Sequence, residues 1–319
     1  MNPEAPRKIL IDTDPGIDDA MAIFYALESP EFEVVGLTSI FGNADIDVAT
    51  VNALKLLEIA GRTDIPVARG VDRPLAMPFR GAVAYVHGAD GQGDVFLSPP
   101  TTSVNELDAP HFIIQSVLDA PGEITLVPLG PLTNIATAFQ LEPTLSSKLA
   151  GIVLMGGNAF VGGNASPAAE ANILNDPEAA DIVFGADCQV VMAGLDVTEP
   201  TIMTTSDLAR IAMFDNPRAQ HLAAIVPFYA NFYRQRLGIE GICIHDSTTI
   251  SYMLAPHLYT WVDYPVRVDI GNSVCRGKTQ PAVHVSDVET AWTGRRPVRI
   301  LTEADTRAVV ELELERLAR

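Results

Sequence analysis

Short apolar runs alternate with segments of helical periodicity through the first two thirds of the chain, and this alternation constrains the fold most. The predicted strands are residues 8–12, 33–40, 65–68, 124–128, 151–155 and 189–193, and the predicted helices are residues 17–27, 46–60, 109–119, 132–140, 177–184 and 206–213. Buried, nearly continuous apolar strands between helices are typical of a mostly parallel sheet with helices on both faces. The sequence therefore predicts an α/β protein.

The last third of the chain has a different pattern. We expect a long helix at 217–237, which Pro227 could interrupt, and a further helix from Asp246 to about residue 254. Residues 264–270, 282–285 and 298–301 are predicted to be strands of a meander or sheet edge, and residues 303–319 a closing helix. No internal repeat or low-complexity linker marks a boundary, so residues 1–319 are predicted to form a single large domain.

Composition excludes several classes of protein. The 319 residues are 48% hydrophobic and 19% charged, which is the opposite of a disordered chain. Because 21 basic residues face 40 acidic ones, the net charge is −19. Nucleic-acid backbones and anionic membranes require clustered Lys and Arg, so we expect neither as a partner.

The three cysteines, Cys188, Cys243 and Cys275, are widely spaced and form no CxxC pair. We expect them to be reduced and buried or half-buried, without a disulfide framework. The apolar run near the N-terminus spans only residues 9–11, which is too short for a signal-peptide core. These features predict a soluble cytoplasmic protein.

Four carboxylates, Asp12, Asp14, Asp18 and Asp19, lie where the first predicted strand ends and the first helix begins. Helix capping and the helix dipole explain one or two acids at such a junction, and solvated acids are the simplest alternative. Four converging carboxylates would raise one another's pKa unless a cation neutralised them. Ligation by oxygen alone suits a hard cation, Ca²⁺ or Mg²⁺. Asp246, which also follows a short apolar run, is a further candidate ligand.

The block at residues 12–20, DTDPGIDDA, is similar to the N-terminal fingerprint of the inosine–uridine preferring nucleoside hydrolases. Further matches follow in order at 41–43, 87–88 with 90–91, 130–134, 155–157, 163–164, 170 with 172, 176–180 and 245–246. The resemblance implies a Rossmann-like fold with one Ca²⁺ in a pocket, hydrolysis of ribonucleosides to free nucleobase and ribose, and a homodimer or homotetramer. It also implies a place in nucleoside catabolism and in purine and pyrimidine salvage.

The same resemblance implies a role for individual residues. Asp14, Asp19, Asp246 and the carbonyl of Leu129 would bind Ca²⁺, and Asp14 would also be the general base for the metal-bound water. The residues expected to bind ribose are Asp18, Asn43 and Asn172 at the diol, Asn164 and Glu170 at the 5′-hydroxyl, and Met155 beneath the sugar. His87 and His245 would face the nucleobase, His245 assisting its departure, with Tyr233 as a further base contact.

These residue types suit N-glycoside cleavage, because negative charge stabilises an oxocarbenium-like transition state and a carboxylate can remove a proton from water. The chain departs from the resemblance at Gln92, Ala171 and 247–249, which leaves the base preference and the 5′-hydroxyl contact open.

Other residues are expected to be structural. His111, His221, His257 and His284 are predicted to be surface or capping histidines, and Phe228, Tyr229 and Phe232 to belong to the helix core. Glu4, Glu311 and the C-terminal acids are predicted to lie on solvated faces. Two alternative functions stay open: a DxDxT-type phosphatase with Asp12 as nucleophile, which Gly16 fits poorly, and a non-catalytic nucleoside- or ribose-binding protein.

Overall fold

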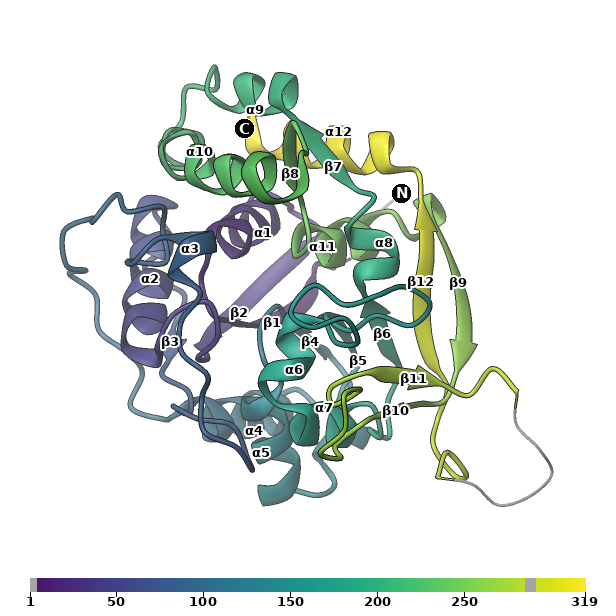
Figure 1. The fold of residues 1–319 in the computed structure, drawn as a ribbon. Coiled ribbons are helices and arrows are strands. Elements are labelled where there is room, and N and C mark those ends of the chain that lie inside the picture. Colours follow the sequence, from purple (N-terminus) through teal and green to yellow (C-terminus); the bar gives the residue numbers. More distant parts are fainter. Residues whose placement is uncertain (1–4, 285–290) are drawn as a thin grey trace.

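A single extended sheet organises the computed structural model, which describes residues 5–284 and 291–319 (Figure 1). Within those residues the sheet has eight strands in the order β3-β2-β1-β4-β5-β6-β12-β9. The strands are β1 Arg7–Thr13, β2 Phe32–Ser39, β3 Val67–Ala68, β4 Ile124–Pro128, β5 Gly151–Met155, β6 Val190–Ala193, β12 Val298–Ala304 and β9 Tyr259–Tyr264. Every pairing is parallel except that of β12 with β9, which forms an antiparallel edge.

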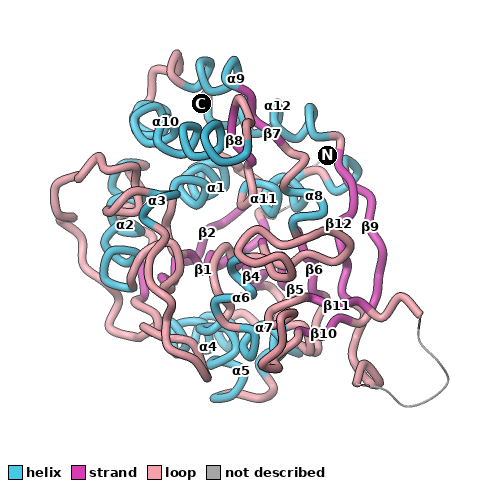
Figure 2. Tube along the Cα trace, in the orientation of Figure 1, coloured by secondary structure: helices cyan, strands magenta, loops and turns pink. Residues whose placement is uncertain are grey.

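Helices cover both faces of the sheet (Figure 2). One face carries α1 Ile17–Leu27, α2 Ile46–Ile59, α10 Pro217–Leu237, α11 Ser247–Leu254 and α12 Thr306–Leu317, and the other carries α4 Ala109–Asp119, α5 Thr133–Leu141 and α7 Pro177–Val183. Strand β1 contributes Ile9 and Ile11 to the first hydrophobic core and Leu10 to the second. Successive side chains of a strand point to opposite faces of the sheet, so β1 lies between the two hydrophobic cores.

The remaining elements are short. The short helices are α3 Ala84–His87, α6 Ala171–Asn175, α8 Leu195–Thr198 and α9 Thr205–Ile211, and two 3₁₀ turns lie at Leu145–Lys148 and Pro256–Leu258. Two small antiparallel sheets pair β7 Ile202–Thr204 with β8 Gly241–Cys243 and β10 Val266–Val268 with β11 Thr279–Pro281. None of the helices in the two described ranges is long and apolar enough to span a membrane.

The predicted fold class is confirmed: the sheet is mostly parallel and flanked by helices, in the Rossmann-like manner. Helices α1, α4 and α10 and strands β4 and β5 have the predicted bounds. Pro227 does not interrupt α10. Pro227 is exposed, and Ala223, whose carbonyl loses its hydrogen bond to position 227, is only half-buried, so water can satisfy that carbonyl.

The largest errors of the sequence prediction lie near the C-terminus. The expected strand at 264–270 is divided between the end of β9 and β10, and the edge strand β9 was missed. The prediction of a strand at 282–285 is wrong for residues 282–284, because strand β11 ends at Pro281. Val285 lies outside the described residues. The closing helix begins only at Thr306, since Glu303 and Ala304 still belong to β12.

Three predictions of burial are also wrong. Cys275 is exposed, while Cys188 and Cys243 are free and buried as expected. His221 is buried on the inner face of α10, beside Leu222. Glu313, predicted to be solvated, is fully buried on the inner face of α12, which leaves a carboxyl group inside the hydrophobic core.

Glu313 has one polar partner within that core. The hydroxyl of Ser247 donates a hydrogen bond of 2.8 Å to Oε1 of Glu313, and Oε2 has no partner. Burial therefore raises the pKa of Glu313 to about 8. Because its pKa is higher in the folded state than in the unfolded state, the carboxyl group makes its full contribution to stability when the pH is below the unfolded pKa. This contribution falls as the pH rises and is lost once the pH passes the folded pKa.

We predict that Glu313→Gln becomes progressively more stable than the native protein between pH 5 and pH 8. The neutral amide lacks the ionisation that opposes folding, so the difference in unfolding free energy should widen by up to about 1.4 kcal/mol per pH unit. Urea unfolding of both proteins across this pH range measures the difference. A difference that does not change with pH would show that Glu313 titrates normally.

Candidate active site

The carboxylate segment joins strand β1 to the first helix, α1. Asp12 is the penultimate residue of β1, Asp14 lies in the turn, and Asp18 and Asp19 lie in the first turn of α1. Because β1, β2, β4 and β5 run parallel, the segments after them meet at one edge of the sheet. The site lies at this edge.

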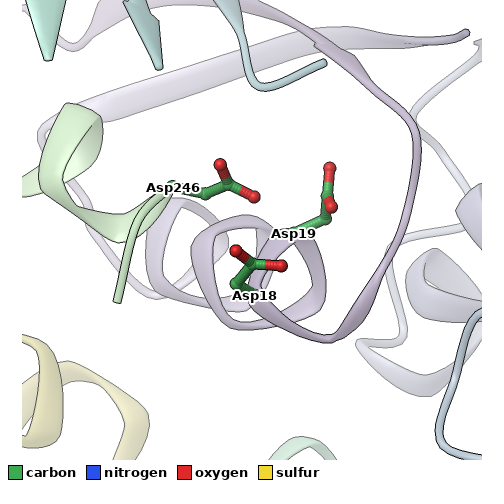
Figure 3. Close-up of side chains that lie close together, drawn as sticks. All are labelled: Asp18, Asp19 and Asp246. Atoms are coloured by element: carbon green, nitrogen blue, oxygen red, sulfur yellow. The ribbon is translucent and has the colours of Figure 1, made fainter. Parts of the chain in front are cut away.

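Three carboxylates form a tight group there (Figure 3). Oxygen atoms of Asp18, Asp19 and Asp246 lie within 4.8 Å of one another, and all three residues are buried. Burial is the main cause that raises the pKa of each carboxyl group, and the neighbouring carboxylates raise the pKa of Asp19 and Asp246 further. Asp246 directly precedes α11, which packs against α1 and so brings the two segments together.

Asp14 lies in a narrow cradle beside this group. The backbone N–H of Asn43 donates to its Oδ2 at 2.7 Å, while Oδ1 is buried without a partner. A Cβ atom on Gly42 would lie 2.0 Å from Oδ2, and one on Gly130 would lie 2.4 Å from Oδ1. The carboxylate therefore has room only because both neighbours are glycine. Burial and, next, repulsion from Asp19 raise the pKa of Asp14 well above its usual range.

Asp12 has a different role from the others. Its Oδ1 accepts hydrogen bonds from Thr38 Oγ1 on β2 and Asn134 Nδ2 on α5, at 2.5 and 2.7 Å. Burial raises the pKa of Asp12 to about 7. The side chain thus links three elements of the fold.

Asn43 and Asn172 bind the protein's own groups around the cluster. The Asn43 amide donates to Asp19 Oδ2 at 3.0 Å. The Asn172 amide donates to the carbonyl of Leu129 at 2.6 Å and to that of Met155 at 3.2 Å. The structure therefore brings Leu129, Met155 and Asn172 together.

Glu170 and Asn164 lie in the segment that follows β5. The buried carboxylate of Glu170 accepts the backbone N–H groups of Gly157, Asn172 and Ile173, so it caps α6. Burial raises its pKa, and its charge in turn raises the pKa of Asp246. Asn164 is exposed and accepts the N–H of Ala171, and it is not part of the buried cluster.

A chain of hydrogen bonds leads from the carboxylates to His245. Tyr229 Oη donates to Asp18 Oδ2 at 3.1 Å. The hydroxyls of Tyr229 and Tyr233 are 3.2 Å apart, and Tyr233 Oη is 2.8 Å from His245 Nε2. At the far side, His245 Nδ1 lies 2.8 Å from Thr198 Oγ1. Tyr229 and Tyr233 lie on α10, Thr198 lies at the end of α8, and His245 lies just before α11.

The direction of this chain follows from its first bond. Because Tyr229 donates to the Asp18 carboxylate, its oxygen accepts from Tyr233, and Tyr233 accepts in turn from His245 Nε2–H. Burial lowers the pKa of His245 to about 4, so the ring is neutral at neutral pH. Its Nδ1 therefore accepts from the Thr198 hydroxyl.

His87 completes this side of the pocket. Its Nδ1 accepts the N–H of Ile17 at 3.2 Å, and its ring stacks on Tyr229 with 5.3 Å between centroids. Burial lowers the pKa of His87 to about 4 as well. Two neutral histidines thus lie beside the acidic cluster.

Sequence reasoning missed Tyr229 and Thr198. Tyr229 was predicted to belong to the helix core, yet its hydroxyl contacts Asp18. The spacing of Tyr229 and Tyr233, four residues apart on α10, was the available signal, because it places both hydroxyls on one helix face. Thr198, at the end of α8, carried no comparable signal.

The donor set fits a hard cation. It consists of carboxylate and carbonyl oxygens, and the buried Oδ1 atoms of Asp14 and Asp18 accept no hydrogen bond from the described residues. Asp18 Oδ1 lies 3.9 Å from Nδ1 of the neutral His87. In the described parts of the chain no Lys or Arg forms an ion pair with Asp14, Asp18, Asp19 or Asp246. The fold and the site together define an α/β protein with a buried oxygen-lined site suited to a metal ion such as Ca²⁺ or Mg²⁺.

The comparisons with known proteins agree with this class. Residues 9–311 match the family described as inosine-uridine preferring nucleoside hydrolase. The chain is 44% identical over 314 residues to a probable uridine nucleosidase 2 of Arabidopsis thaliana, which covers 98% of this chain and 97% of that protein.

Two solved structures are similar over almost their whole length. A plant nucleoside hydrolase has a TM-score of 0.95 and 42% identity, with 98% of this chain and 99% of that chain covered. A purine-preferring ribonucleoside hydrolase from Gardnerella vaginalis has a TM-score of 0.91 and 30% identity, with 98% of each chain covered. The chain therefore belongs to the inosine–uridine preferring nucleoside hydrolase family, as predicted, and is an N-glycosyl hydrolase.

We predict that a bound divalent cation raises the melting temperature of the native protein and that Gly130→Ala weakens this rise. A cation at about 100 times its dissociation constant stabilises the folded protein by about 2.7 kcal/mol, which raises the melting temperature by several degrees. The added Cβ would displace Asp14 and reduce this rise. Differential scanning fluorimetry of metal-stripped protein, with and without Ca²⁺, measures this rise in melting temperature.

The matched control is Gly162→Ala, because a Cβ at Gly162 meets only the carbonyl of Pro167 at 3.7 Å. This variant should keep the full rise in melting temperature. A full rise in Gly130→Ala as well would contradict the account of the Asp14 cradle.

Proposed function

We propose that this protein hydrolyses the N-glycosidic bond of ribonucleosides in a Ca²⁺-dependent reaction and releases nucleobase and ribose. The observation that carries the proposal is the buried carboxylate group with unpartnered oxygens, joined by hydrogen bonds to a neutral histidine. Membership of the family supports it, as does the likeness to a probable uridine nucleosidase.

Asp14, Asp19, Asp246 and the carbonyl of Leu129 would hold the cation. The Leu129 oxygen accepts from Asn172 but keeps a second lone pair for a metal. When bound, Ca²⁺ would supply positive charge that lowers the pKa of a coordinated water and would accept ribose hydroxyls in its shell. Its charge would also relieve the repulsion among the carboxylates.

Asp14 is the proposed general base. Its Oδ2 is fixed by the N–H of Asn43, while Oδ1 has no protein partner and is free to accept a proton from water.

The ribose would lie over the carboxylates. Asp18, whose Oδ1 is unpartnered, would bind the diol together with Asn43 and Asn172. Asn164 and Glu170 would bind the 5′-hydroxyl, and Met155 would lie beneath the sugar. The negative charge of these acids would stabilise positive charge that develops on the ribose ring.

His245 would assist the departure of the nucleobase, with His87 and Tyr233 as further base contacts. In the structure its Nε2–H points to Tyr233. Because the ring is neutral, we propose that His245 acts as a hydrogen-bond donor whose bond shifts from Tyr233 to the leaving base. Thr198 would hold the ring in this tautomer.

The phosphatase alternative has less support. Asp12 would have to act as the nucleophile, but it is fully buried and its Oδ1 is engaged by Thr38 and Asn134. The further parts of the proposal rest on resemblance: a homodimer or homotetramer that acts in the cytoplasm in nucleoside catabolism and salvage.

We predict that Asp14→Asn lowers kcat for ribose release by roughly 100- to 10,000-fold, because the amide cannot accept the proton. The assay is free-ribose detection with inosine, uridine, cytidine, adenosine and guanosine, with circular dichroism to confirm folding. We expect inosine and uridine to be substrates. Native activity in the variant would contradict the role of Asp14, and saturable nucleoside binding by the native protein without ribose release would favour a binding protein.

We predict that His245→Ala slows inosine hydrolysis by roughly 100-fold or more but has much less effect on a p-nitrophenyl riboside. The activated leaving group of the second substrate departs without assistance. Comparing kcat/KM for the two substrates separates leaving-group assistance from general damage to the pocket. An equal loss on both substrates would remove this role from His245.

A further inference from the structure

Gln92 is a buried polar residue that joins three parts of the site. It is 3% exposed and lies in the loop after α3. Its Nε2 donates to the carbonyl of Gly16 at 2.8 Å and to that of Pro15 at 3.1 Å. Its Oε1 lies 2.9 Å from Nε2 of His221 on α10. The amide therefore lies between α10 and the turn that carries the site carboxylates.

The orientation of this amide is determined by its partners. Both carbonyls require a donor, so the Gln92 nitrogen faces them and its oxygen must accept from His221 Nε2–H. Burial lowers the pKa of His221 to about 4, so the ring is neutral and carries its proton on Nε2. The charged groups that act on His221 are Asp90 and Lys55, and its ring packs edge-on against Phe24 of α1 at 6.2 Å.

The two carbonyls belong to the turn between Asp14 and Asp18. The Gly16 carbonyl also accepts the first hydrogen bond of α1, from Ala20, and the Gly16 N–H donates to Asp19 Oδ2 at 2.9 Å. An apolar side chain of similar size would leave the Gly16 carbonyl with one acceptor site unfilled in a buried position. The peptide planes of the turn would then reorient, and the neighbouring carboxylates would move with them.

Asn52 supports the same turn from α2. Its Nδ2 donates to the Pro15 carbonyl at 3.2 Å and to the Asp90 carbonyl at 2.8 Å, so it ties the turn to the Gln92 loop. The Pro15 carbonyl therefore accepts from two side chains, Asn52 and Gln92. Among the described residues, the Gly16 carbonyl accepts from the side chain of Gln92 alone. This makes Gln92 the better single point at which to test the turn.

We propose that Gln92, oriented by His221, is a positioning residue for the cation-binding carboxylates. The inference rests on the proposed function, since it assigns these two residues to the Ca²⁺ site. Among the described residues, neither side chain forms a hydrogen bond or an ion pair with Asp14, Asp18 or Asp19. They act through the backbone of the turn, and His221 acts only through Gln92.

The test uses four variants of the full chain: Gln92→Leu, His221→Phe, His221→Gln and, as control, Ser116→Ala. Residues that orient metal ligands typically contribute 10- to 100-fold in metal affinity or activity. We expect Gln92→Leu to weaken Ca²⁺ binding roughly tenfold and to lower kcat with inosine. His221→Phe keeps the ring but loses the donor, so it should show the same direction of change. His221→Gln restores a donor and should recover both properties.

Isothermal titration of metal-stripped protein with Ca²⁺ measures the affinity independently of turnover. Ser116→Ala removes a half-buried hydrogen bond to the Phe112 carbonyl on α4, away from the site, and should leave both properties unchanged. The proposal would be overturned if Gln92→Leu had a lower melting temperature but kept the native Ca²⁺ affinity and the native kcat. If Gln92→Leu does not fold, equal behaviour of His221→Phe and His221→Gln would overturn it.

These outcomes separate the two proposals. If the native protein binds Ca²⁺ and releases ribose, and Gln92→Leu does both equally well, only the positioning role is contradicted. If the native protein neither binds Ca²⁺ nor releases ribose, both the proposed function and this inference are contradicted.

Discussion

The mutual repulsion of buried carboxylates is the interaction on which the site depends. Asp18, Asp19 and Asp246 converge within 4.8 Å, and Asp14 lies in the glycine cradle beside them. Like charges in a poorly hydrated site are strongly unfavourable unless protons or a cation neutralise them. The surrounding structure supplies hydrogen bonds to individual oxygens but no Lys or Arg partner among the described residues. This arrangement therefore suits a cation site better than a set of structural ion pairs.

The fold holds this unfavourable group in place from several directions. Strand β1 is an interior strand of the sheet, and α1, which follows it after a short turn, packs against α10 and α11. Thr13 and Asn43 fix Asp19, and the backbone of Asn43 fixes Asp14. Gln92 and Asn52 fix the turn between them. The hydrogen bonds from Asp18 through Tyr229 and Tyr233 to His245 then connect the acidic side of the pocket to the neutral side.

Much of this could be predicted from local sequence patterns. The alternation of apolar strands with amphipathic helices determines the fold class, and the DTDPGIDDA block locates the acids at the end of β1. Properties that depend on tertiary packing could not be predicted in this way. Whether Glu313 and His221 are buried depends on which face of α12 and α10 meets the core, and Tyr229 reaches Asp18 only because α10 lies across α1. The edge strand β9 was missed because its partner β12 is about forty residues away in the sequence.

The most direct test of the account is a titration of metal-stripped protein with Ca²⁺, in which heat of binding and ribose release from inosine are followed in parallel samples. The account predicts one ion per chain and activity that rises with the occupied fraction. In Asp246→Asn, binding and activity should decline together. Full ribose release by protein without bound metal, or Ca²⁺ binding that leaves activity unchanged, would contradict the claim that a cation balances these carboxylates in the working enzyme.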